Sequence, residues 1–423
     1  MNDLLHRPLR ELATRLVRRE LTAEALVRAC IERIAEVDAS IEAWTALDTD
    51  RALRLARGID AGAVRGALHG VPVGVKDLID TGDLPTAYGS PIYQGHQPAM
   101  DAACVGQLRT AGAYVLGKTV TTEFATMVPG KTRNPHSPPG TAHTPGGSSS
   151  GSAAAVAARM VPLALGTQTA ASVVRPAAYC GVVGFKPTFG LLPVTGVKLQ
   201  APSLDTVGVF TRAVDDAAFA VGAMARLDLS PRRPATLRAA LCRTPWWDEA
   251  DADARRALAE AGDRLKAHGV QVIDVDLPPH WAALTDAQLD IMGFEAAAAF
   301  APERLAHLSL ISAPLRQMLD FGAEVSGQRV AAAHALVARA RAELATVMAG
   351  VDVWLAPSAT GVAPAGLTGT GNPVFSRAWS ALGVPCVHVP CGQGAHGLPV
   401  GVTVAAPPWQ DALALGAAQW VEN

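Results

Sequence analysis

The stretch Gly146-Gly147-Ser148-Ser149-Ser150-Gly151-Ser152 lies in the middle of a hydrophobic chain, and Gly166-Thr167-Gln168-Thr169-Ala170-Ala171-Ser172 follows it closely. Between the two, the small residues at 153–158 predict a helix, and Val161 to Gly166 predicts a buried strand. A Gly/Ser run is often a flexible linker, but a linker rarely opens directly into a packed helix. Backbone N–H groups at a helix N-terminus form a natural anion or oxyanion site. The two stretches are therefore interpreted as a site that holds serine hydroxyls.

The composition is that of a globular protein with a sizeable core. The chain has 423 residues, of which 49% are hydrophobic, which is enough for one large core or two moderate ones. The 36 basic and 38 acidic residues give a net charge of -2 and argue against nucleic acid or an anionic membrane as a partner. The first residues do not resemble a signal peptide, and no apolar run reaches the ~18 residues that span a bilayer. We therefore expect a cytoplasmic protein.

The cysteines and histidines indicate neither disulfides nor a metal site. The 6 cysteines are scattered and form no CxxC pair, so free buried thiols are expected. The 11 histidines show no ligand spacing such as HExxH. No metal and no cofactor is therefore expected, and a homodimer is compatible with this composition.

Apolar strands alternate with helices along the whole chain. The predicted strands are Ile41–Leu47, Leu68–Asp77, Tyr114–Leu116, Val161–Gly166, Leu237–Cys242, Val270–Val275, Val351–Ala356, Val384–Val389 and Val400–Val404. The predicted helices are Leu9–Glu20, Leu21–Val37, Asp50–Gly58, Asp101–Ala111, Gly151–Met160, Val214–Ala225, Asp251–His268, Ala283–Phe300, Val330–Met348 and Gln410–Val421. This alternation predicts an α/β layered fold with a largely buried sheet, and no linker-like segment interrupts it.

Lys76 ends the apolar strand Val71 to Val75, which can carry its side chain into the interior. Burial disfavours an ammonium ion, so the pKa of such a lysine falls, and only the neutral amine accepts a proton. A solvated Lys-Asp turn is the structural alternative.

Ser172 follows small residues that would let a carbonyl group approach the backbone N–H groups closely, although a strand-to-loop corner would show the same pattern.

Two general motifs match but are given little weight. The segment 147–151 fits GxSxG, a nucleophile elbow centred on Ser149, yet any run of Gly and Ser fits it, and nothing marks His388 as its partner. The segment 112–119 fits the P-loop pattern GxxxxGK[ST], which would make Lys118 and Thr119 a nucleotide site. Its Tyr-Val-Leu core is strand-like, whereas a phosphate cradle needs a flexible loop.

Several linked segments together resemble the amidase signature family. The similarity is close from Leu68 to about Thr211 and includes 180–190 and 203–208, and the segments 383–385 and 397–401 resemble the family's C-terminal strands. Ser148 and Ser172 lie 24 positions apart, which fits the two-serine spacing of the family. The resemblance implies one α/β/α domain over residues 1–423 around a mostly parallel mixed β-sheet. Its signature core would span about 68–211, and a variable substrate-facing part about 212–380.

The resemblance also implies roles for individual residues. Ser172 would be the nucleophile, Ser148 the bridging serine after a cis peptide bond, and Lys76 the base. The backbone N–H groups of Thr169, Ala170, Ala171 and Ser172 would form the oxyanion hole. Ser149, Gln168 and Arg175 would support the site.

The sequence departs from the commonest family pattern at two places in the stretch 166–172. Gln168 replaces a frequent Asp, and Ala170-Ala171 replaces one or two glycines. If Ala171 had a positive φ, its methyl group would cost about 1 kcal/mol.

The implied activity is hydrolysis of a C–N bond in a small or hydrophobic amide through an acyl-enzyme. A carbamate, an ester or a urea derivative would use the same groups. A further alternative is an amidase of the amidotransferase type, which works as one subunit with a partner. The substrate pocket is expected around 123–127 and 281–379. Its apolar candidates are Trp281, Met292, Phe294, Phe321, Phe375 and Trp379, although most of these could equally belong to the core.

Overall fold

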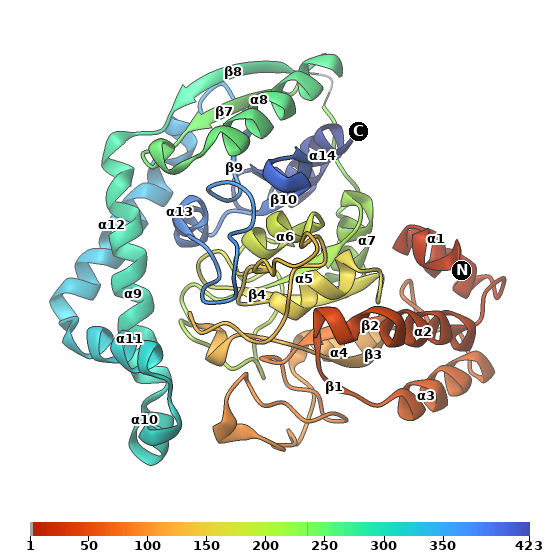
Figure 1. The fold of residues 1–423 in the computed structure, drawn as a ribbon. Helices are drawn as coiled ribbons and strands as arrows, with labels where there is room; N and C mark the ends of the chain where they lie inside the picture. The colour runs from red at the N-terminus through yellow and green to blue at the C-terminus, as the bar shows by residue number, and fades with distance from the viewer. Residues whose placement is uncertain (1–2, 235) are drawn as a thin grey trace.

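The computed structural model describes residues 3–234 and 236–423, which form one large sheet covered by helices (Figure 1). The strands are β1 (Trp44–Leu47), β2 (Pro72–Lys76), β3 (Tyr114–Thr119), β4 (Leu163–Gln168), β5 (Val183–Lys186), β6 (Thr206–Thr211), β7 (Arg238–Arg243), β8 (Gln271–Asp276), β9 (Val353–Pro357), β10 (Cys386–Gln393) and β11 (Pro399–Ala405). In this described part of the chain the sheet has 11 strands in the order β1-β3-β2-β4-β6-β5-β10-β11-β9-β7-β8.

The helices are α1 (Leu9–Val17), α2 (Ala23–Ile41), α3 (Thr49–Ala61), α4 (Ala103–Thr110), α5 (Ser150–Ala157), α6 (Val174–Cys180), α7 (Val214–Ala225), α8 (Ala252–Ala267), α9 (Ala283–Ala299), α10 (Ala301–His307), α11 (Ala313–Glu324), α12 (Gly327–Val347), α13 (Val374–Leu382) and α14 (Asp411–Glu422). The predicted α/β class and the mixed sheet are confirmed.

Strand direction divides the sheet into three parts. Parallel pairing joins β3, β2 and β4 in one block and β9, β7 and β8 in another. The pairs between these blocks, from β4 through β6, β5, β10 and β11 to β9, are antiparallel, as is β1 with β3. Since β2 and β4 are parallel neighbours, their carboxyl ends meet at one edge of the sheet, and these ends carry Lys76 and Gln168.

Small residues let helices α5 and α6 pack closely against the centre of the sheet. Every residue of α5 from Ser150 to Val156 is buried, and so is every residue of α6. Gly151 shows how tight this contact is, because a Cβ there would lie 2.2 Å from Ala43 O and 2.4 Å from Val120 N. The serine stretch is therefore the buried entrance to a packed helix and not a linker.

The long helices α9, α11 and α12 stand together at one side of the molecule, with α13 between them and the centre of the sheet (Figure 1). Helices α9 and α12 were predicted from the sequence, whereas α10, α11 and α13 were not. The elements α6, β5 and β6 were also not predicted separately, since each is only 4 to 7 residues long. Pro176 inside α6 further obscures its helical pattern.

For three of the aromatic pocket candidates, the alternative of a place in the core is the one that the structure shows. Trp281, Phe375 and Trp379 are each 1% exposed. Trp354 packs between Trp281 and Trp379, with ring centroids 5.9 and 5.5 Å away. Large aromatic side chains gain most by full burial, and sequence alone does not distinguish this burial from a place in a pocket wall.

No helix among the described residues is both long and apolar enough to cross a bilayer.

The P-loop hypothesis for 112–119 is wrong, because Tyr114 to Thr119 form β3 inside the sheet. Lys118 is fully buried there and donates to Ile79 O at 2.7 Å and Thr86 Oγ1 at 2.5 Å. It has no free ammonium group to offer a phosphate.

Candidate active site

Lys76 places its amine inside the protein next to two hydroxyl groups. Its side chain is 0% exposed, and Nζ lies 2.6 Å from Ser148 Oγ and 2.7 Å from Thr167 Oγ1. Burial lowers the pKa of Lys76 to about 7, while the negative charge of Asp205 opposes this shift. The ammonium form can donate to both hydroxyls, and the neutral form has a lone pair that can accept from one of them. A solvated Lys-Asp turn is thus excluded.

The first serine stretch is pinned to the strand that leads to the second. The peptide bond between Gly147 and Ser148 is cis, as the resemblance implied. Ser149 Oγ donates to Thr167 O at 3.2 Å and accepts from Thr167 N at 3.3 Å. Both contacts are buried, so they fix the register between the start of α5 and the end of β4. This register brings Ser148 and Thr167 to the same amine.

Replacing Ser149 by alanine should lower the free energy of unfolding by about 2 kcal/mol, because two buried backbone groups of Thr167 lose their partner. Ser150→Ala is a matched control, since the Ser150 hydroxyl makes one long contact of 3.5 Å with Ser148 O. Denaturant titration of both variants measures the difference. Equal stability of the two variants would contradict the assignment of Ser149 as a brace.

Gln168 joins three segments at the start of the second stretch. Its Oε1 accepts from Val173 N at 2.9 Å and Val174 N at 3.0 Å, and so caps the first turn of α6. Its Nε2 donates to Ser380 Oγ at 3.0 Å, and Ser380 Oγ donates in turn to Ala170 O at 2.8 Å. The amide oxygen can therefore accept the backbone bonds that a carboxylate would, and the amide N–H₂ adds a link to α13 that a carboxylate could not make.

The loop from Thr169 to Ser172 presents unused donors. Among the described residues, none of its four backbone N–H groups donates a hydrogen bond to a protein acceptor. Ala170 and Ala171 are not among the described residues with positive φ, so their methyl groups impose no left-handed strain. Ser172 is 8% exposed, and its hydroxyl makes no hydrogen bond to a described residue. The direct contact in the structure is between Lys76 and Ser148, and Ser172 offers an uncommitted hydroxyl beside free N–H groups.

Arg175 ties the two stretches together from the following helix. Its Nη2 donates to Gly147 O at 2.8 Å and Thr370 Oγ1 at 2.9 Å, and its Nη1 donates to Gly371 O at 2.5 Å. Burial lowers its pKa to about 10, so the guanidinium stays charged at neutral pH. The contact with Gly147 O anchors the residue directly before Ser148.

Thr167 and Asp205 belong to this cluster but were not predicted as site residues. The Asp205 carboxylate accepts from Gln200 N at 2.7 Å, from Ala201 N at 3.0 Å and from the Thr169 hydroxyl. Burial raises the pKa of Asp205 to about 6, and its hydrogen bonds oppose that shift. The only sequence signal for Asp205 was its place in the segment 203–208, which was noted but given no role.

The GxSxG alternative lacks its histidine. His388 is fully buried in β10, and its Nδ1 lies 2.7 Å from the hydroxyl of Ser358, not of Ser149. Burial lowers the pKa of His388 to about 3, which keeps the ring neutral. Both hydrogen bonds of Ser149 Oγ go to the Thr167 backbone. Ser149 is thus committed to structure, and this alternative loses its base.

Comparison with known proteins agrees with the geometry. The model of the family described as Amidase matches residues 25–415. The chain belongs to the amidase signature family. It is also 34% identical to a glutamyl-tRNA(Gln) amidotransferase subunit from Anaeromyxobacter sp. (strain K), over 100% of this chain and 96% of that protein. It is 32% identical to 2-amino-5-chloromuconic acid deaminase of Comamonas testosteroni, over 99% and 96% of the two chains.

Solved structures share the fold over nearly the whole chain. Native peptide amidase from Stenotrophomonas maltophilia superposes with a TM-score of 0.81 at 28% identity and covers 98% of this chain and 96% of its own. A vestigial complex linked to an s-triazine catabolic enzyme gives a TM-score of 0.88 at 27% identity and covers 98% of both chains. As a member of this family, the protein is an enzyme that acts on C–N bonds.

Proposed function

We propose that this amidase is a serine amidohydrolase that cleaves a small amide through an acyl-enzyme. Ser172 is the nucleophile, Ser148 the proton relay and Lys76 the base. The observation that supports this most strongly is the fully buried Lys76 amine at 2.6 Å from Ser148 Oγ. A buried amine with a pKa of about 7 is poised to exchange protons at neutral pH.

Catalysis begins with neutral Lys76. The amine takes the proton of Ser148, Ser148 takes the proton of Ser172, and Ser172 Oγ attacks the carbonyl carbon. The carbonyl oxygen becomes an oxyanion, which the free N–H groups of residues 169–172 receive; one such donor is typically worth about 3 kcal/mol. The C–N bond then breaks as Ser148 returns a proton to the departing amine. Water repeats the sequence on the acyl-enzyme and releases the acid.

The rate should rise with pH through the neutral range. Because the pKa of Lys76 is lowered to about 7, the amine is protonated below that pH and cannot accept a proton, and it is neutral above it. We expect kcat/KM for a non-ionising amide to increase about tenfold per pH unit below about 7 and to level off above it. A pH–rate profile measured from pH 5 to 9 checks this expectation. A flat profile over the neutral range would contradict the role of Lys76.

The substrate class is proposed as an amide, with carbamates, esters and urea derivatives as substrates of the same machinery.

We propose one domain over 1–423, with a signature core at about 68–211 and substrate contacts from about 212–380. Two observed links support this division. Gln288 Nε2 of α9 donates to Thr169 O at 3.3 Å, and Ser380 Oγ of α13 donates to Ala170 O at 2.8 Å. The second half of the chain thus touches the predicted oxyanion loop directly.

An amidotransferase subunit is a second candidate, favoured by the full-length similarity to proteins of that name. Such a subunit would release ammonia from glutamine for a partner and show little activity alone. The purified single chain should be assayed with glutamine and with a panel of simple amides, carbamates and anilides. Turnover of simple amides without a partner supports the amidohydrolase. Turnover that requires an added partner and is restricted to glutamine would overturn it.

A further inference from the structure

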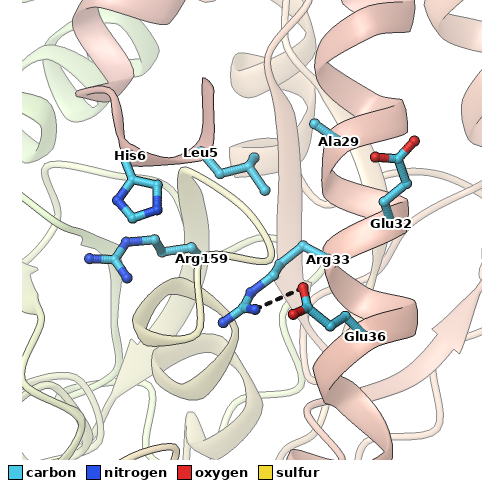
Figure 2. Close-up of a pocket in the computed structure, with 7 residues that line it drawn as sticks. All are labelled: Leu5, His6, Ala29, Glu32, Arg33, Glu36 and Arg159. Carbon is cyan, nitrogen blue, oxygen red and sulfur yellow. Dashed lines mark hydrogen bonds and ion pairs between the residues drawn. The ribbon is translucent and has the colours of Figure 1, made fainter. Parts of the chain in front are cut away.

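One surface depression of this protein is lined by as many carboxylates as guanidinium groups. Figure 2 shows this depression, lined by residues that include Arg33, Glu36 and Arg159. Arg33 Nη1 pairs with Glu36 at 2.9 Å, and Arg33 Nε donates to Ala158 O at 2.9 Å. Acidic and basic groups alternate around this depression, so it offers no net charge to an anion.

Arg377 differs, because its charge has no acidic partner among the described residues. It lies on α13, three residues before Ser380, whose hydroxyl donates to Ala170 O of the predicted oxyanion loop. Its Nη1 donates to Gln288 Oε1, and Gln288 Nε2 donates to Thr169 O at 3.3 Å. Arg377 is therefore connected to the loop before Ser172 by two independent links.

The guanidinium of Arg377 has unused donors that reach accessible space. It forms no ion pair with any residue in 3–234 or 236–423, and Nη1 to Gln288 is its one hydrogen bond there. Its Nε and Nη2 are not among the enclosed, unsatisfied nitrogen atoms of that part of the chain. Arg175, the other cation close to it, is occupied by three oxygen atoms of the protein. An arginine held partly buried without a counter-charge is costly unless a ligand supplies one.

We propose that Arg377 binds a carboxylate on the substrate, so that this amidase prefers monoamides of dicarboxylic acids, which keep one free carboxylate, over neutral amides such as the corresponding diamides. Guanidinium groups bind carboxylates through two parallel N–H donors, and Nε with Nη2 form such a pair. This inference rests on the proposed function for its substrate class. One relative is named 2-amino-5-chloromuconic acid deaminase, after a substrate that is an acid, which is consistent with an anionic substrate here.

The test uses pairs of nearly isosteric substrates that differ in charge. Succinamate and glutaramate carry a carboxylate where succinamide and glutaramide carry a second neutral amide. We expect wild-type kcat/KM to be on the order of 100-fold higher for the better anionic substrate than for its diamide. Arg377→Gln should remove that preference by lowering kcat/KM for the anionic substrates far more than for the diamides, and Arg377→Lys should retain part of it.

The matched control removes a different positive charge from the same half of the chain. Arg329 on α12 is 54% exposed in its side chain and is paired with Asp290, so Arg329→Gln should leave the preference unchanged. If Arg377 only positions Gln288, Arg377→Gln would lower kcat/KM for both members of a pair equally. That result, or a wild-type enzyme without preference, would overturn the inference and leave the proposed function intact.

A binding measurement distinguishes failure of this inference from failure of the proposed function. Calorimetric titration of Ser172→Ala with succinamate and glutaramate measures affinity without turnover. We expect the added Arg377→Gln substitution to weaken binding of the better ligand by about 100-fold. If the wild type hydrolyses none of the amides, the hydrolase proposal fails, and this titration still decides the subsite. Equal affinity with and without Arg377 would overturn it.

Discussion

Ser172→Ala should reduce kcat for the best amide substrate by about 10⁴-fold or more, because the proposed acyl-enzyme forms on the hydroxyl of this residue. Folding should be unaffected, since the Ser172 hydroxyl makes no hydrogen bond to a described residue. The expected signature is a variant that binds substrate with near-normal affinity, unfolds at the wild-type denaturant concentration and does not turn over. Steady-state kinetics and denaturant titration on one preparation measure both properties.

Ser149→Ala and Ser150→Ala are the controls for that experiment. Ser149 braces the loop through Thr167, so its loss should reduce stability and lower kcat less than loss of Ser172. Ser150 makes one weak contact and should remain close to wild type. If Ser149→Ala abolished activity more completely than Ser172→Ala, the nucleophile would be Ser149 and the GxSxG alternative would return.

Lys76→Met should lower kcat/KM by about 10³- to 10⁴-fold, which corresponds to a barrier higher by about 4 to 5 kcal/mol. Its free energy of unfolding should change by less than about 2 kcal/mol, because an apolar side chain of similar length replaces a group that is costly to bury. Loss of activity without a matching loss of stability is the sign of a buried base. The residual activity should also no longer rise with pH near 7.

Lys118→Met provides the matched control, because Lys118 is also fully buried and lies on the neighbouring strand β3. Burial lowers the pKa of Lys118 to about 8, opposed by the carboxylate of Asp77, which lies 3.5 Å from Nζ. Removing Lys118 leaves Asp77 buried without its cation, so this variant should lose about 3 kcal/mol of stability. The folded fraction should keep its catalytic rate. If Lys118→Met lost activity and Lys76→Met kept it, the base would be Lys118 and not Lys76.

The sequence was sufficient for the fold class and, through the family resemblance, for Lys76 and Ser148 at the buried amine, whereas Thr167 was not predicted. The closeness of Lys76 and Gln168 is explained by the sheet, because both residues end apolar strands and parallel neighbours align their carboxyl ends. The position of Ser148 follows from where α5 begins, and the small residues 153–158 predict that helix. The local pattern left a linker and a site both open, and the roles of Ser148, Ser172 and Lys76 came from the resemblance to the family.

Other features depend on contacts between segments far apart in the chain. Asp205 reaches Thr169, and Ser380 reaches both Gln168 and Ala170, across separations that no local pattern encodes. The same limit explains why the sequence left open whether Trp281 and Trp379 line a pocket or belong to the core, because a buried aromatic residue and one in a pocket wall have the same local sequence. It also explains why the role of Gln168 was unclear until Val173, Val174 and Ser380 were found beside it.

The most direct test of the central claim is a covalent label. A fluorophosphonate that reacts with activated serine hydroxyls should add one equivalent of mass to the wild-type chain, and peptide mapping should locate it on Ser172. Labelling should accelerate as the pH rises through about 7 and should be lost in Ser172→Ala and strongly slowed in Lys76→Met. An adduct on Ser149 or any other residue, or labelling of Ser172→Ala at the wild-type rate, would contradict the account.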